Sequence, residues 1–430
     1  MRVCAILALL GLLSGPVAAA DTIIHAGRLI AVPGEPATSE QSILIRDGRI
    51  AELRDGYARP VDEWGDATVI DLTDKTVLPG LIDSHTHITS ELGPGNKLDA
   101  VTLEDAAVAL RAVDYAGRTL QAGFTTIRNT GAKAEVILPL RDAIAAGHVM
   151  GPRIVAAGGG ISGTGGHADA HGYRLDFLEM LSNPTTCNGP DDCRRAVRQL
   201  VKQGSDLIKI TSTGGVLSET AAGTGQQMFN DEIVAIVETA RMLGRKVAAH
   251  AHGKEGIEAA LRAGVDSIEH GTFADEETFE LYKQADAYLV PTMLAGQTVV
   301  EMASQSNTFM PKPIKDKALA VGPTMRAMVK GAHEAGVKIA FGTDSGVSKH
   351  GDNARELLLM AKAGMPNEAI LISATINAAD LLGLSNTTGT LEPGKAADII
   401  AVDGDPLEDL QVMLDVPFVM ARGQVAKHRD

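Results

Sequence analysis

The sequence predicts an α/β protein, a (β/α)8 TIM barrel with a small β-sandwich built from both chain ends. Two observations carry this prediction. Eight short β-branched runs alternate with helical patterns in the middle of the chain, and the segments on either side alternate apolar and polar residues as strands do. We therefore expect the sandwich domain at 21–78 and 388–430 and the barrel at 79–387.

The strand candidates of the barrel are short, apolar and rich in β-branched residues. They lie at 80–87, 124–130, 153–158, 206–212, 246–252, 267–271, 288–293 and 338–344. Helices are expected between most of them, for example at 102–123, 231–244 and 254–264, each ending at a glycine. Thr102 is the expected N-cap of the first of these helices. This alternation favours a barrel over a doubly wound sheet.

The first twenty residues have the pattern of a secretory signal peptide. Arg2 precedes an apolar run at 3–13, and three small residues, Ala18 to Ala20, come before Asp21, the expected first residue after cleavage. The run is too short to span a bilayer. We expect an exported protein, periplasmic or secreted, that makes no membrane contact once the signal is cleaved.

The amino-acid composition limits the classes of molecule that the protein is expected to bind. Hydrophobic residues make up 45% of the chain and charged residues 22%, as in ordinary folded proteins. The net charge of −15 at pH 7 repels polyphosphate, so nucleic acid is not an expected partner. After signal cleavage two cysteines remain, Cys187 and Cys193, and in an oxidising compartment their proximity favours a disulfide over a metal site.

The expected ends of five barrel strands carry groups that bind metals or ionise. The catalytic groups of such barrels lie at the C-terminal strand ends, and alternation along a strand points both histidines of an HxH pair the same way. The candidates are His85, His87, Lys209, His250, His252, His270 and Asp344. Lys209 stands in the apolar run DLIKITS, where an unpaired ammonium is costly, so an ion-pair partner or another means of compensation is required.

Five segments, LPGLIDSHTH, LIKITSTGG, VAAHAHG, SIEHG and FGTDSG, resemble signature segments of the amidohydrolase superfamily of metal-dependent hydrolases. The resemblance implies two divalent metal ions, usually Zn²⁺, bridged by a hydroxide and by a CO2-derived carbamate on Lys209. It also implies that Asp344 takes a proton from the attacking water and passes it to the departing amine. The implied ligands are His85, His87 and Asp344 for one ion and His250 and His270 for the other, with Lys209 between them.

The segment VAAHAHGKEGIEAALRAGVDSIEHGT most resembles a branch of Xaa-dipeptidases, carboxypeptidases and ochratoxin-hydrolysing amidohydrolases. The branch implies a zinc-dependent enzyme that cleaves the amide bond of dipeptides or N-acyl amino acids with a free carboxylate, a class that includes ochratoxin A. The implied partner is a small molecule, and a homo-oligomer is expected.

Substrate contacts are the next set of candidates. We expect His252 either to contact the substrate or to form a hydrogen bond with a residue that binds the metal. His167 lies with His171 in the long glycine-rich loop expected at 158–190, which is either solvated or folded over the mouth as a lid. A substrate carboxylate requires a cation or a phenol, for which Arg128 and Tyr173 are the candidates.

Three other functions are alternatives. A deaminase of this superfamily usually has a glutamate three residues after the ligand of the fifth strand. That position is Gly253 if the ligand is His250, but Glu255 if the ligand is His252. A lactonase and a non-catalytic scaffold relative are the others, and the scaffold is disfavoured because all six ligand positions are filled.

Overall fold

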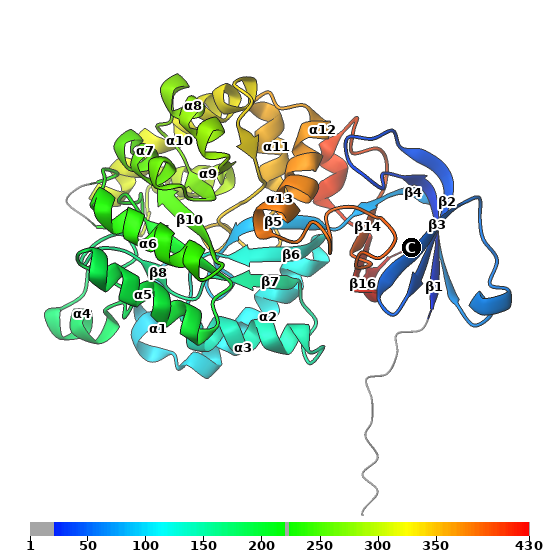
Figure 1. The fold of residues 1–430 in the computed structure, drawn as a ribbon, viewed down its shortest axis with the longest axis horizontal. Coiled ribbons are helices and arrows are strands. Elements are labelled where there is room, and N and C mark those ends of the chain that lie inside the picture. Colours follow the sequence, from blue (N-terminus) through cyan, green and yellow to red (C-terminus); the bar gives the residue numbers. More distant parts are fainter. Residues whose placement is uncertain (1–20, 220–222, 430) are drawn as a thin grey trace, which may run out of the picture.

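The computed structural model describes residues 21–219 and 223–429, as a β/α barrel with a β-sheet domain beside it (Figure 1). The predicted signal peptide, residues 1–20, lies outside the described residues. Within the described ranges, no helix is both long and apolar enough to cross a membrane.

Every strand candidate of the barrel contains a strand, which confirms the predicted alternation. The barrel strands are β5 (Leu81–Thr86), β6 (Phe124–Asn129), β7 (Arg153–Ala156), β8 (Gly160–Ile161), β9 (Leu207–Thr211), β10 (Lys246–Ala251), β11 (Ser267–His270), β12 (Tyr288–Val290) and β13 (Lys338–Ile339). The third predicted strand corresponds to β7, and the short strand β8 lies beyond it, in the segment expected to be a loop. Strands β5 to β7 and strands β8 to β13 form two parallel ladders.

Hydrogen bonds between the two ladders close the barrel. On one side, Asp206 N donates to Ala156 O at 2.8 Å, so that β7 and β8 both adjoin β9. On the other side, Ser84 N donates to Phe341 O at 2.8 Å and Asp344 N donates to His85 O at 2.8 Å. The second seam therefore places the end of β5 directly beside the segment that follows β13.

Helices surround the barrel in Figure 1. They are α1 (Asn96–Thr102), α2 (Asp105–Gln121), α3 (Ala134–Ala145), α4 (Leu175–Leu181), α5 (Pro190–Gln203), α6 (Asn230–Met242), α7 (Lys254–Ala263), α8 (Glu276–Ala285), α9 (Met293–Ser304), α10 (Lys312–Glu334), α11 (Arg355–Lys362), α12 (Asn367–Ile372) and α13 (Ala378–Leu382). The expected N-cap Thr102 is wrong, since Thr102 ends α1. Leu103 is extended (φ −96°, ψ 129°) and separates α1 from α2.

Helix α5 illustrates how sequence sets these boundaries. Pro190 stands in its first turn, where a missing N–H costs nothing, and Gly204 ends it in the left-handed conformation with φ 105°. Its buried residues are Cys193, Ala196, Val197 and Leu200, a helical spacing that presents one apolar face to the barrel.

Both chain ends contribute to one seven-stranded sheet. Its strands are β1 (Thr22–Leu29), β2 (Thr38–Arg46), β3 (Arg49–Asp55), β4 (Thr68–Pro79), β14 (Ile399–Val402), β15 (Phe418–Ala421) and β16 (Gln424–His428), in the order β16-β15-β14-β4-β1-β2-β3. Ile50 of β3 and Phe418 of β15 share one apolar core although their strands are far apart in this order. The sheet therefore curls over its own core, as a small sandwich does, and β4 leads into β5 through Gly80.

The segment at 158–190 is more ordered than the predicted loop, because it contains β8 and α4. Cys187 and Cys193 form the expected disulfide, which ties the end of this segment to the first turn of α5. Both cysteines are fully buried.

Replacing both cysteines by alanine should lower the free energy of unfolding by about 2 kcal/mol, because the unfolded chain loses a cross-link. Urea unfolding of the double variant and of the wild-type protein, both under non-reducing conditions, measures the difference. Equal midpoints and slopes would show that the disulfide contributes nothing to stability.

Candidate metal centre

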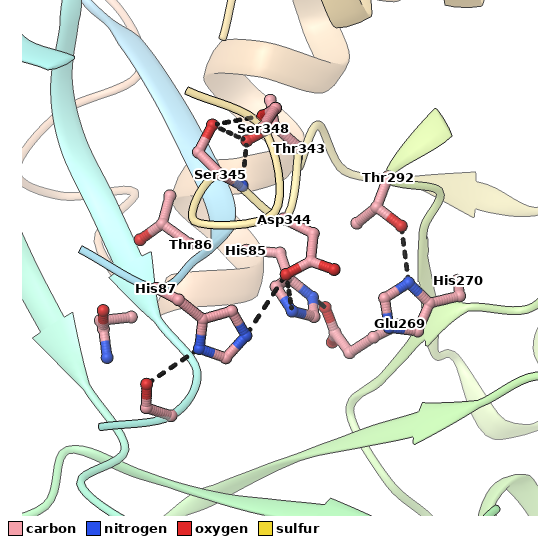
Figure 2. A network of polar contacts seen from close by, with 12 residues as sticks. His85, Thr86, His87, Glu269, His270, Thr292, Thr343, Asp344, Ser345 and Ser348 are labelled. Carbon is pink, nitrogen blue, oxygen red and sulfur yellow. Dashed lines mark hydrogen bonds and ion pairs between the residues drawn. The ribbon is translucent and has the colours of Figure 1, made fainter. Parts of the chain in front are cut away.

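His85, His87 and Asp344 form the first group of the site, at the seam between β5 and the segment after β13. Asp344 Oδ1 lies 3.5 Å from Nε2 of His85 and 3.3 Å from Nε2 of His87. Figure 2 shows both imidazoles pointing at this carboxylate. The other ring nitrogens are engaged: His85 Nδ1 bonds Glu269 Oε2 at 2.7 Å and His87 Nδ1 bonds Gly131 O at 2.9 Å.

These hydrogen bonds determine which atoms face the centre of the group. A carboxylate and a carbonyl oxygen only accept, so Nδ1 of each histidine carries the proton and Nε2 presents a lone pair. Burial favours this neutral form, since it lowers the pKa of His87 to about 4 and that of His85 well below its ordinary value. Asp344 Oδ1 is buried without a hydrogen-bond partner among the described residues. Three acceptors thus converge with no donor between them, an arrangement that fits a cation.

A second group consists of His250, His252 and His270. A ligand atom of each lies within 4.8 Å of the others. His270 Nδ1 bonds Thr292 Oγ1 at 2.6 Å, and that hydroxyl already donates to Pro291 O at 2.8 Å. The hydroxyl must therefore accept from His270, which leaves Nε2 of His270 with a free lone pair.

The other two histidines of this group are also held by one nitrogen each. His252 Nδ1 bonds Thr272 Oγ1 at 2.8 Å, and Nε2 of His250 lies 3.4 Å from Gly214 O. Histidines that bind metals are commonly oriented through the nitrogen that does not bind, an arrangement that His250 and His270 have. His252, the predicted substrate contact, is oriented in the same way.

Lys209 lies on β9, where it pairs with Gly160 of β8 and Ala248 of β10. Its neighbours Ile208 and Ile210 face the apolar core, so alternation turns the lysine into the barrel. No hydrogen bond or ion pair within the described ranges reaches its ammonium, and burial lowers its pKa to about 8. About one tenth of the amine is thus neutral at pH 7, and the neutral amine is the form that reacts with CO2.

The backbone is strained at the site. His270, Thr292 and Asp344 adopt the left-handed conformation, with φ of 72°, 51° and 57°. Each such residue costs about 1 to 2 kcal/mol. Backbone bonds hold two of them, because Thr292 N donates to Gly342 O at 3.1 Å and Asp344 N donates to His85 O at 2.8 Å. This strain turns the side chains at the strand ends toward the cavity.

One cavity of about 1080 Å³ joins the two groups. All six predicted metal ligands line it, together with His167 and His252. The cavity has an apolar wall, by which we mean Leu92, Val216, Leu217, Val299, Val321 and Met325. The wall is supplied by the segments after β5 and β9 and by α9 and α10.

The predicted substrate contacts differ in their positions. The ring of His167 stacks on that of His250, with centroids 4.1 Å apart and planes inclined by 25°. Tyr173 does not line the cavity, because its hydroxyl lies at the surface and donates to Lys97 O at 3.3 Å. The structure contradicts a substrate contact by Arg128 as well: its guanidinium is buried beneath the site and pairs with Glu269 at 2.8 Å.

The sequence did not reveal the residues that hold the five histidines of the two groups, namely Gly131, Gly214, Glu269, Thr272 and Thr292. Only Glu269 leaves a signal in the sequence. It is a charged residue within the short buried strand SIEH, as Lys209 is within LIKIT, and both require compensation for burial.

Comparisons with known proteins agree with this geometry. A model of the amidohydrolase family matches residues 76–426. An ochratoxinase of Aspergillus niger is 32% identical over 418 residues, covering 91% of this chain and 83% of that protein.

Two solved structures are similar over nearly the whole chain. A Xaa-Pro dipeptidase with bound methionine in its active site is 42% identical, with a TM-score of 0.89 over 94% of this chain and 99% of that one. A prolidase complexed with N-methylphosphonate-L-proline is 31% identical, with a TM-score of 0.84 over 95% of this chain and 100% of that one.

Proposed function

The chain belongs to the amidohydrolase family, and from that premise we propose that it is a binuclear metal-dependent hydrolase of dipeptides or N-acyl amino acids with a free carboxylate. The observation that carries the proposal is the convergence of acceptor atoms without donors at one end of the barrel.

The ligands divide into two sets. His85, His87 and Asp344 would hold one cation, His250 and His270 the other, and a carbamate on Lys209 would bridge them. Imidazole and carboxylate ligands are typical of Zn²⁺ sites, so we propose zinc. Two divalent cations supply Lewis acidity, which activates water and polarises an amide carbonyl. Carboxylation turns the uncompensated ammonium of Lys209 into an anionic oxygen ligand, which resolves the cost of its burial.

Asp344 is the residue proposed to move the proton. In the protein alone, burial raises its pKa to about 7, and a cation beside it would lower that value. Its Oδ1 faces His85 and His87, whereas the strained backbone of Asp344 holds the carboxylate at the cavity wall. It would accept a proton from the attacking water and donate it to the leaving amine.

Substrate size and polarity follow from the cavity. Its volume of about 1080 Å³ exceeds what a dipeptide requires, and the apolar wall suits a hydrophobic side chain or acyl group. The names of the relatives, an ochratoxinase, a Xaa-Pro dipeptidase and a prolidase, support amides of amino acids as the substrate class.

The substrate carboxylate requires a cation, and we propose Lys317 of α10 in place of Arg128. Lys317 does not itself line the cavity, but it binds the segment 215–218, whose Val216 and Leu217 do. Lys317 Nζ donates to Gly215 O at 2.7 Å and to Ser218 O at 2.5 Å, which leaves one of its three protons unused. Burial and then the charge of Lys317 lower the pKa of His252 to about 3, so the ammonium lies near this imidazole. We propose that Lys317, His252 and His167 receive the carboxylate.

Deamination finds no support in the structure. Gly253 stands three residues after His250, and Glu255 lies on α7 and is not among the residues that line the cavity. The complete ligand set likewise disfavours a scaffold without catalysis. The disulfide is consistent with the proposed export to a periplasmic or extracellular compartment.

The proposed activity can be tested with a panel of dipeptides and N-acyl amino acids, ochratoxin A included, each paired with its C-terminal amide. We expect free amino acid to be released from the acids and far less from the amides. Lys317→Met should remove this preference by raising KM for the acids alone. Ammonia release from amino-heterocycles, with no hydrolysis across the panel, would favour a deaminase instead.

Lys209→Ala should lower the metal content below two ions per chain, and short carboxylic acids should partly restore both metal and activity by replacing the carbamate. Elemental analysis and rates with and without added acetate provide the measurement. Lys246→Ala is the matched control, because Lys246 is the first residue of β10, at the end of that strand away from His250. Full metal content in Lys209→Ala, without any rescue, would contradict the carbamate.

Asp344→Asn should retain much of the metal, because the amide oxygen still binds, but should reduce kcat by about 100- to 10,000-fold through loss of proton transfer. Metal analysis and steady-state kinetics on the same preparation separate the two effects. Turnover close to that of the wild type would remove Asp344 from the proton path.

A further inference from the structure

Arg128 of β6 and Glu269 of β11 form a buried ion pair beneath the metal-binding face. Nη2 of Arg128 lies 2.8 Å from Oε1 of Glu269, and the two side chains are 3% and 0% exposed. The proposed chemistry uses neither residue as a ligand, proton carrier or substrate contact. An ion pair at this depth adds little net stability, because desolvation offsets the attraction, so stability alone does not account for it.

The guanidinium of Arg128 connects three barrel strands. Its Nε donates to Ser84 O on β5 at 2.5 Å, its Nη1 donates to Ser267 Oγ on β11 at 3.1 Å, and its Nη2 pairs with Glu269. Ser84 immediately precedes His85, so Arg128 also fixes the backbone that carries this ligand. Lysine has no planar fork with which to make these three contacts together.

The two oxygens of Glu269 have different partners. Oε1 accepts from Arg128 Nη2 and from Ser267 Oγ, the latter at 2.5 Å. Oε2 accepts from His85 Nδ1 at 2.7 Å, and Figure 2 shows Glu269 next to the imidazole of His85. Arg128 therefore holds the carboxylate in its orientation, and the carboxylate accepts the proton of His85 on Nδ1.

We propose that the Arg128–Glu269 pair is a positioning device that fixes the tautomer of His85 and thereby sets the metal affinity of the site. With the proton on Nδ1, Nε2 presents its lone pair toward Asp344. With the proton on Nε2, the same ring would present a donor there and could not bind a cation. The inference rests on the proposed metal centre and deepens it.

Glutamine at position 269 cannot satisfy both neighbours. If its amide nitrogen faces Arg128, the N–H groups of the amide oppose those of the guanidinium, and no hydrogen bond forms between them. If the nitrogen faces His85 instead, the imidazole must give up the proton on Nδ1 and carry it on Nε2. Removing the guanidinium relieves this conflict, because the amide can then donate to Ser267 Oγ while its oxygen accepts from His85. Arg128→Met should therefore restore the zinc affinity that Glu269→Gln lowers.

The test compares the zinc affinity of wild-type protein, Glu269→Gln and the double variant Glu269→Gln with Arg128→Met. Apo-protein competes with a chromophoric chelator for Zn²⁺. We expect Glu269→Gln to bind roughly 10- to 100-fold more weakly, and the double variant to recover most of that loss. Asp398→Asn is the matched control, since it removes another buried carboxylate, paired with Arg153 at 3.0 Å, outside the site. Its zinc affinity should equal that of the wild type.

Two results would overturn the inference: unchanged affinity in Glu269→Gln, or a double variant that binds zinc no better than Glu269→Gln does. A purely structural pair predicts the second result, because two core substitutions would add their damage. Circular dichroism of each apo-protein checks folding. If Glu269→Gln alone does not fold, a folded double variant with near wild-type affinity supports the inference, and a folded one with weak affinity contradicts it. Wild-type protein that binds no zinc would contradict the metal centre itself.

Discussion

The structure is organised around an electrostatic constraint at one end of the barrel: lone pairs and a carboxylate point at the same small volume with no donor among them. His85, His87 and Asp344 create this constraint at the seam that closes the barrel, where β5 adjoins the segment after β13. Burying such acceptors unpaired is costly. A bound cation relieves the cost, so the same atoms that are unfavourable in the protein alone become favourable as ligands.

The rest of the barrel keeps these atoms in place. Every histidine of the two groups is held by one ring nitrogen, through a carboxylate, a carbonyl or a hydroxyl. His270, Thr292 and Asp344 adopt the left-handed conformation and turn the chain at the strand ends. Backbone hydrogen bonds from neighbouring segments keep Thr292 and Asp344 in this conformation. Backbone strain and buried charge at the site thus lower the stability of the fold, but they fix the geometry of the ligands.

The sequence predicted the parts of the molecule that depend on local pattern. The eight barrel strands, the strand-forming chain ends and the nearness of Cys187 to Cys193 all follow from periodicity and spacing. The six ligand candidates could be named because each stands within or near the end of a predicted strand and within a segment that resembles a known family.

Contacts between distant strands could not be predicted in this way. Arg128 is a suitable cation for a substrate by its position near the end of β6, yet its side chain lies beneath the site because Glu269, 141 residues later, compensates its charge. Lys317 gave no signal, since a lysine on a long helix is ordinarily solvated, and only the fold brings it beside Gly215. Thr102 was misplaced because two extended residues, Leu103 and Glu104, divide a segment whose pattern predicts a single helix.

The most direct test of the central claim is anomalous diffraction from crystals of the purified protein, collected on both sides of the absorption edge of the metal that it contains. We expect two strong peaks among the six ligands and density for three extra atoms beyond Nζ of Lys209. A map with no metal peak between His85, His87 and Asp344 and an unmodified amine at Lys209 would contradict it.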